Sequence, residues 1–302
     1  MLSNRVLDLY KTPLSDDSIS RIDSHTSLPY IKSFENNDII EISINRNDAW
    51  VLIHDAALSI RGKLKKTAGA GNVKFVNNAG AFFFDSITYL LNGIEMEHVK
   101  DPGITSLIRG YLCYTEEDSN HLNVAGWNYP DVPATYTDGA FFMRIPLYHL
   151  LGIFTDYKMA ISGKHTIRLV RARNDANCML ITGADTKAEL VIEKIDLKVK
   201  HIIPNDCLKI QLLQSVKTDR PILIPFRKWE LHELPALNVG STKEMWSVKT
   251  TTSVDCPPLK NNSLWVVTKR FPNDKCRINS DSFRVYPNKA PPQTSYWSRW
   301  FL

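Results

Sequence analysis

The dipeptide Asn92-Gly93 stands between two β-prone runs, residues 86–91 and 94–97. Asparagine and glycine tolerate the positive φ angles that both central residues of a type I′ turn require. This turn matches the twist of two antiparallel strands, so the pattern predicts a β-hairpin over residues 86–97.

Alternating apolar and polar residues predict strands on both sides of this hairpin. Ile40, Ile42 and Ile44 alternate with polar residues, and a second strand with the same rhythm is expected from Trp50 to Ile60. Later strands are expected at residues 141–145, 165–171, 189–203, 208–213, 222–226, 228–234, 246–251 and 264–269. Many short strands separated by Pro, Gly and Asn favour an all-β fold of the jelly-roll or related sandwich type.

One short helix is predicted after the hairpin. Asp101 would serve as its N-cap and Pro102 as its first residue, followed by apolar residues at spacings of three and four. Residues 117–139 are rich in Asn, Asp, Pro, Gly and Tyr without a period, and this composition predicts a long loop.

The chain of 302 residues suits two domains better than one. We expect an N-terminal arm at 1–30, a first jelly roll at 31–203, a partial second jelly roll at 204–276 and an irregular tail at 277–302. The sequence Pro204-Asn205-Asp206 is the best candidate boundary between the two rolls.

The second roll has fewer strand-like runs than a jelly roll needs. Residues 204–302 offer only about five or six, whereas a jelly roll has about eight. We expect a shortened or frame-altered gene, with a compact second domain as the alternative. Trp297, Trp300 and Phe301 would then either cover the exposed inner face or be disordered.

Charge, cysteine usage and hydropathy exclude several classes of protein. The 37 Lys and Arg against 32 Asp and Glu leave a net charge of +5, too small to predict nucleic-acid binding. The five cysteines are widely spaced, which favours free, reduced thiols in the cytosol or nucleus. We expect no secretion signal and no membrane span.

Motifs for catalysis or cofactor binding are missing. The eight histidines lie at least 16 residues apart, so the His-x-His pair of a cupin metal site is absent. No G-x-S-x-G or phosphate-loop motif occurs, and the glycines and lysines of residues 63–72 are interpreted as a solvated loop. Cys113 and Cys178 lie in apolar patterns typical of inert buried thiols.

Glu95 and Glu97 are the remaining candidates for chemistry. Lying two apart on a predicted strand, they would project from the same face and could bind a cation or share a proton. A solvated strand face is the favoured interpretation. The sequence thus predicts no enzyme, and no catalytic, cofactor-binding or metal-ligating residue.

Carbohydrate binding is the alternative function, because lectin modules share the jelly-roll fold and use exposed aromatic platforms. The candidate platform residues are Trp127, Tyr129, Tyr136 and Trp246. Their spacing does not separate a sugar platform from a protein contact, where aromatic residues are equally enriched.

A resemblance to a known family lies in residues 82–95, which read FFFDSITYLLNGIE, and in Pro102-Gly103-Ile104-Thr105-Ser106. Two later stretches agree with it, residues 145–154 with 163–169, and residues 225–229. From about residue 31 to about residue 276 the chain resembles the double jelly-roll major capsid proteins of eukaryotic DNA viruses and their genome-integrated relatives.

This resemblance implies a structural subunit without an active site or cofactor. Its expected partner is itself, in homotrimers of pseudo-hexagonal outline that contact neighbouring capsomers and minor capsid or penton proteins in an icosahedral shell. The resemblance also implies assembly in the host cytoplasm or nucleus and a place in the virion, whereas a host-domesticated interaction module is a further alternative. The open sheet edges and the apolar residues Phe141, Phe142 and Ile153 predict the same self-association.

Overall fold

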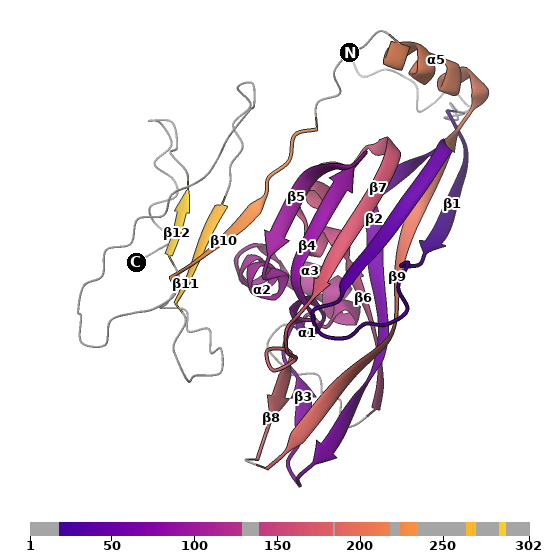
Figure 1. Ribbon diagram of the computed structural model, residues 1–302. Coiled ribbons are helices and arrows are strands. Elements are labelled where there is room, and N and C mark those ends of the chain that lie inside the picture. The colour runs from indigo at the N-terminus through magenta and orange to yellow at the C-terminus, as the bar shows by residue number, and fades with distance from the viewer. Residues whose placement is uncertain are drawn as a thin grey trace, which may run out of the picture.

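A computed structural model describes residues 18–128, 139–183, 185–217, 224–234, 264–269 and 284–287. Antiparallel strands make up most of these residues, and the predicted all-β class is confirmed. Figure 1 shows a tall main sheet with helices against one of its faces and a small separate sheet, β10–β12, beside it.

The hairpin predicted at Asn92-Gly93 is confirmed. It consists of strands β4 (Phe84–Leu91) and β5 (Ile94–Lys100), which pair antiparallel. Asn92 has a φ of 52° and Gly93 a φ of 84°, so both turn residues adopt the positive φ of a type I′ turn. The Oδ1 atom of Asn92 also accepts a hydrogen bond from the backbone N–H of Lys164 at 2.8 Å, which fixes the turn to the neighbouring strand.

The main sheet has the strand order β1-β9-β2-β7-β4-β5, with β6 also paired to β2. Its central strand, β2 (Ile39–Ala68), is 30 residues long, where two separate strands were predicted. A register shift between Arg46 and Val51 marks the place where the break was expected, and the chain continues through it as strand. The strands that pair with β2 are β6 (Gly139–Pro146), β7 (Ala160–Arg171) and β9 (Lys187–Pro204), and β1 (Ile19–Ser27) pairs with β9.

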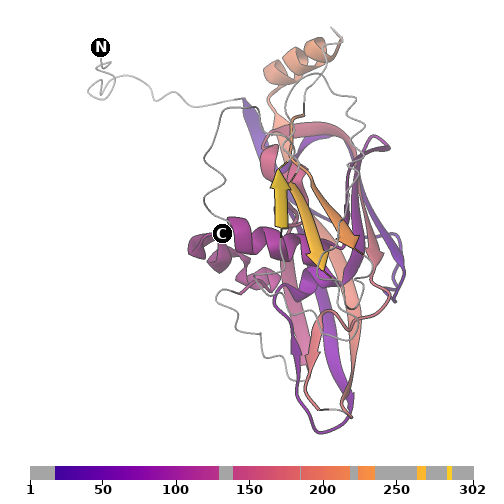
Figure 2. The same cartoon turned by 90° about the vertical axis from the view of Figure 1, so that its left-hand side faces the viewer.

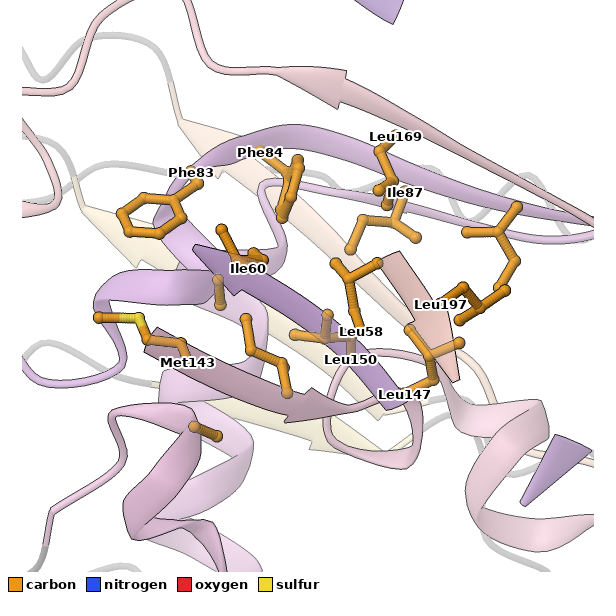
Figure 3. Packing of buried hydrophobic residues seen from close by; sticks show 14 of the residues in the cluster. Leu58, Ile60, Phe83, Phe84, Ile87, Met143, Leu147, Leu150, Leu169 and Leu197 are labelled. Atoms are coloured by element: carbon orange, nitrogen blue, oxygen red, sulfur yellow. The ribbon is translucent and has the colours of Figure 1, made fainter. Parts of the chain in front are cut away.

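Strand β2 belongs to both halves of this sheet. Its first half pairs with β7, whereas its second half lies between β6 and β9. Buried residues from the two halves and from β4 and β7 form one core (Figure 3), with Leu58, Ile60, Ile87 and Leu169 fully buried. The sheet therefore curls around a single apolar interior, as a jelly roll does.

The predicted helix is confirmed as α2 (Pro102–Cys113), but Asp101 does not cap it through its side chain. Asp101 adopts a left-handed conformation with φ 46°, and Pro102 is the first helical residue. The described residues contain four further helices, α1 (Ala79–Phe82), α3 (Glu116–Leu122), α4 (Gly152–Asp156) and α5 (Asp206–Lys217), and the single turns η2 (Asn123–Ala125) and η3 (Leu147–His149). Figure 2 shows α1, α2 and α3 gathered on one side of the sheet.

The long loop predicted at 117–139 is wrong over its first part, where α3 and η2 lie. Helix α3 begins with a capping box, because the Thr115 hydroxyl accepts from the Asp118 N–H and the Asp118 carboxylate accepts from the Thr115 N–H. Residues 129–138 lie outside the described residues.

The expected N-terminal arm contains a strand. Residues 19–27 form β1, which pairs antiparallel with β9 along the edge of the main sheet. The alternation of β1 is weak because most of its side chains are exposed, which explains why no strand was predicted there.

After β9 ends at Pro204, the chain forms helix α5 where a strand at 208–213 was predicted. The short strands β3 (Val73–Phe75) and β8 (Met179–Ile181) pair with each other, and the third sheet contains β10 (Trp229–Leu234), β11 (Leu264–Lys269) and β12 (Arg284–Pro287). Strand β11 confirms the prediction at 264–269, whereas β12 lies within the tail that was expected to be irregular. The strand predicted at 222–226 is wrong over residues 224–226, which have no regular structure, and its residues 222–223 lie outside the described residues, as does the strand predicted at 246–251.

Candidate functional site

Residues 224–229, which we call the clasp segment, attach the chain that follows α5 to the main sheet. The segment runs into β10. It contacts helix α4 through Arg227 and helix α2 through Trp229, and β10 contacts the strand β5. Ile224 and Phe226 are partly buried against the core cluster. These contacts hold the start of β10 against the main sheet and its helices.

The first element of the site is a β-bulge on the hairpin. Tyr89 pairs with Glu97, but the next residue, Leu90, pairs with Glu95, so the register shifts by one residue between them. The shift turns the two carboxylates to different sides, because a bulge adds one residue to one strand. Glu95 is exposed and Glu97 is 2% exposed. The predicted common solvated face of Glu95 and Glu97 is therefore wrong.

Glu97 holds the start of α4. Its Oε1 accepts from the Gly152 N–H and its Oε2 from the Ile153 N–H, both at 2.9 Å. Burial raises the pKa of Glu97 to about 7, and the two backbone hydrogen bonds and the charges of Arg109 and Lys228 oppose this rise. A carboxylate that accepts two N–H groups fixes the position of the turn that leads into α4.

Gly152 provides the space for the clasp segment. A Cβ at this position would overlap the carbonyl oxygen of Arg227 and would lie 3.3 Å from Glu97 Oε1. Only glycine lets the backbone of Arg227 come this close to the helix start.

Asp156, at the other end of α4, binds the clasp segment directly. Its Oδ2 accepts from the backbone N–H and from Nε of Arg227, both at 2.9 Å, and its Oδ1 accepts from Nη2 at 2.7 Å. These hydrogen bonds from Arg227 lower the pKa of Asp156 and raise the pKa of Arg227. The pair is a bidentate arginine–carboxylate contact, the geometry that gives direction as well as attraction.

Arg109 of α2 completes the site. Its guanidinium is buried and donates to the Tyr148 carbonyl at 3.0 Å and to Thr155 Oγ1 at 2.9 Å. Its Cζ lies 5.6 Å from the centre of the Trp229 ring, within reach of a cation–π interaction. The site thus joins α2, α4 and β5 to the segment that starts the next sheet.

A buried polar network lies beneath α2 near the site. His149 is fully buried, with Nδ1 at 2.8 Å from the Tyr114 hydroxyl and Nε2 at 2.9 Å from Asn78 Oδ1. Burial lowers the pKa of His149 to about 3 and raises the pKa of Tyr114 to about 12, so both are neutral. His149 is therefore a core histidine with both ring nitrogens satisfied.

The aromatic platform predicted for sugar binding is not formed by Trp127. The residue is 1% exposed, donates from Nε1 to Ser119 Oγ at 3.1 Å and packs against Tyr111 and Tyr114. The other three candidates, Tyr129, Tyr136 and Trp246, lie outside the described residues.

Of the three apolar residues predicted to drive association, only Phe142 is available. Phe141 and Ile153 are buried in the core because they sit on β6 and α4, not in loops. Phe142 is 47% exposed, and the Arg61 guanidinium lies 5.4 Å from its ring centre.

The cysteine predictions are half right. Cys178 is buried, donates to the Asp175 carbonyl at 3.0 Å, and has its thiol pKa raised by burial. Cys113 is exposed, as are Tyr111 and Leu112 beside it at the end of α2. Cys113, Cys178 and Cys207 are free thiols, and Cys256 and Cys276 lie outside the described residues.

Neither a metal site nor a membrane helix is found in the part of the chain that the structure describes. There, no three His, Cys, Asp or Glu side chains gather in a way that could hold a metal ion. In the same residues no helix is long and apolar enough to cross a membrane.

Comparisons with solved structures find weak similarity to viral capsid proteins. A structure of PBCV-1 VP54 fitted into the virophage Sputnik is 11% identical, with a TM-score of 0.44, over 68% of this chain and 47% of that one. The Faustovirus major capsid protein is 10% identical, with a TM-score of 0.46, over 69% of this chain and 58% of that one. A Sputnik virophage structure is 12% identical, with a TM-score of 0.44, over 68% and 53%.

The chain spans about half the length of these solved structures. No curated protein matches it significantly. The family comparison is more direct, because the model of the double jelly roll-like domain matches residues 73–270, which is more than half of the chain. The match confirms the resemblance seen in the sequence, and the chain belongs to the double jelly roll-like domain family.

Proposed function

We propose that this protein is a structural, non-enzymatic capsid subunit that assembles with copies of itself. The observation that carries the proposal is the double jelly roll-like domain over residues 73–270. The matched residues contribute β4, β5, β6, β7 and β9 to the main antiparallel sheet, which curls around one core, and they include the clasp segment.

The finer form of the proposal is a homotrimer. Three copies, each with two rolls, would give a pseudo-hexagonal capsomer that packs beside neighbouring capsomers in an icosahedral shell. Minor capsid or penton proteins would be further partners, and the site of action would be the virion, with assembly in the host cytoplasm or nucleus. The outer edge of β1, which pairs only with β9 among the described residues, supports association because unpaired strand edges favour pairing with another chain.

The buried network under α2 and the hydrogen-bonded Glu97 support a structural role. Both satisfy buried polar groups within the fold, and satisfied buried groups stabilise a fold without requiring a substrate.

Sizing combined with a glycan array tests the proposal. Light scattering of the full chain at micromolar concentration should report an oligomer with a mass that is a multiple of three chains, and the array should show no selective sugar binding. A strict monomer would contradict the capsid role, and selective binding of one glycan by a small oligomer would favour the lectin alternative.

A further inference from the structure

His201 is a buried histidine without a hydrogen-bond partner in the described residues. It lies in β9, where it pairs with Asp23 of β1 on one side and with Val51 of β2 on the other. The residue is 2% exposed, and neither Nδ1 nor Nε2 has a partner. An imidazole in this position is stable only when it is neutral, because a buried charge without an acceptor is costly.

His25 of β1 packs edge-on against this ring. The two ring centroids are 4.7 Å apart and the ring planes are inclined by 74°. His25 Nε2 is buried and has no hydrogen-bond partner, although the side chain as a whole is one-third exposed. The contact is therefore between two imidazoles that touch without a hydrogen bond and face each other across the β1–β9 boundary.

Several charged groups lie near His201, but none of those described is hydrogen-bonded to its ring nitrogens. Strand β1 contributes Asp23 and His25, β2 contributes Arg46, and β7 contributes His165. Asp23 Oδ2 is already engaged by Arg21 Nη2 at 2.8 Å, and His25 Nε2 lies 4.0 Å from the same oxygen.

His165 is occupied as well, with Nδ1 at 2.9 Å from the Tyr89 hydroxyl and Nε2 at 3.3 Å from the Ile161 carbonyl. Burial, with the charges of His25 and Arg46, lowers the pKa of His201, and Asp23 opposes this. A proton on His201 would therefore be repelled by Arg46 and by any proton on the two neighbouring histidines.

Strand β1 buries little of its side-chain surface. It is an edge strand, its only strand partner is β9 among the described residues, and most of its side chains are exposed, Ile22 at 54% among them. Edge elements with little buried apolar area open at low free-energy cost. A change of charge at the His25–His201 contact can therefore shift the equilibrium between β1 paired with β9 and β1 released from it.

We propose that His201, packed against His25, forms an acid-sensitive latch, which holds β1 on β9 while the His201 ring is neutral and releases β1 when that ring is protonated. Release would uncover the edge of β9 for pairing with another strand. This inference does not depend on the proposed capsid function, since it concerns one edge of the main sheet.

The direction of the effect follows from the pKa of His201. Because this pKa is lower in the folded protein than the ordinary 6.5, the paired state binds fewer protons than the released state. The pairing is therefore fully stable above that ordinary value and loses stability as the pH falls below it.

Hydrogen exchange of the full chain, followed by mass spectrometry at about pH 7.5 and about pH 5.5, tests the latch. After correction for the intrinsic exchange rate, protection of β1 should fall at the lower pH by up to about tenfold, the limit for an imidazole one pH unit below its ordinary pKa. Protection of β4 should stay constant.

Two variants make the test specific. His201→Phe keeps an aromatic ring but cannot be protonated, so β1 should keep its protection at both pH values. His121→Gln removes an exposed imidazole from α3 and should behave as the unaltered chain does. The latch is refuted if β1 protection does not change with pH, if β4 loses protection in parallel, or if His201→Phe responds as the unaltered chain does.

Discussion

Arg227 and Asp156 are 71 residues apart in the sequence, and their side chains meet through two hydrogen bonds, Nε to Oδ2 at 2.9 Å and Nη2 to Oδ1 at 2.7 Å. The backbone N–H of Arg227 donates to the same carboxylate. One carboxylate at the end of α4 therefore fixes both the backbone and the side chain of the clasp segment.

Replacing Asp156 by Ala should loosen the clasp segment. The variant loses three hydrogen bonds, but Arg227 is 65% exposed and water replaces part of the interaction, so we expect a loss of about 1–2 kcal/mol in unfolding free energy. Urea unfolding measures this loss, and limited proteolysis should show faster cleavage near residues 224–229. Glu193→Ala, which breaks the exposed Lys63–Glu193 pair, is the control and should change little. Equal effects of the two substitutions would contradict the role of Asp156 in the clasp.

Gly152→Ala should displace the clasp segment by overpacking. The new methyl group would overlap the Arg227 carbonyl oxygen, and relieving such an overlap costs about 1–3 kcal/mol. Gly139→Ala is the matched control, because a Cβ at Gly139 meets no atom within 4 Å. Denaturant midpoints compare the two variants, and an equal loss of stability in both would rule out the overlap at Gly152 as the cause.

Glu97→Gln should destabilise the protein, whereas Glu95→Gln should not. The new side-chain amide has an NH2 donor in place of one accepting oxygen, so one of the two backbone N–H groups faces a donor, at a cost of about 1–3 kcal/mol. Glu95 is exposed on the same strand and has no comparable partner role in the described residues. Thermal unfolding of the two variants at neutral pH should separate them clearly.

The raised pKa of Glu97 also predicts that the unfolding free energy depends on pH. Its pKa is about 7 in the folded protein against an ordinary value of 4.5, so the folded state holds a proton that the unfolded state has released between these values. The contribution of Glu97 to stability is therefore present below about pH 4.5 and is lost as the pH rises toward 7. Unfolding free energies measured over this range should show a component that decreases with pH in the unaltered chain and is missing in Glu97→Gln. The same component in both proteins would show that another group causes it.

Trp127→Ala should cost about 3–5 kcal/mol, as expected when a large buried aromatic side chain leaves a cavity. Its ring also covers the backbone at Gly110 and contacts His149, so the loss should extend to α2. Calorimetry measures the change. If Trp127 were an exposed platform residue, the substitution would leave the melting temperature nearly constant. An unchanged melting temperature would therefore contradict the buried position of Trp127.

Local signals in the sequence were sufficient for parts of the fold. The Asn92-Gly93 turn, the helix that begins at Pro102 and the strand at 264–269 each depend on neighbouring residues, and the structure contains all three. Helix α3 had such a signal too, since Thr115 and Asp118 have the spacing of a capping box. Helix α5 was mistaken for a strand because a short apolar run fits both periods.

The candidate site could not be predicted in this way. Glu97 points inward because of a bulge, and a bulge changes the face of a residue without any marked change in the local pattern. The partners of the clasp segment, Asp156 and Gly152, lie more than 70 residues before Arg227, so only the folded chain brings them together. The pair His25 and His201 is separated still further along the chain and meets only because β1 lies on β9.

Single-particle electron microscopy of the purified full chain is the most direct test of the proposed capsid role. We expect particles of three subunits with a pseudo-hexagonal outline, each subunit contributing two side-by-side β-sandwiches, and a mass three times the 34.4 kDa of one chain. Monodisperse particles of one chain, with no trimers and no larger closed assemblies at any concentration tested, would contradict it.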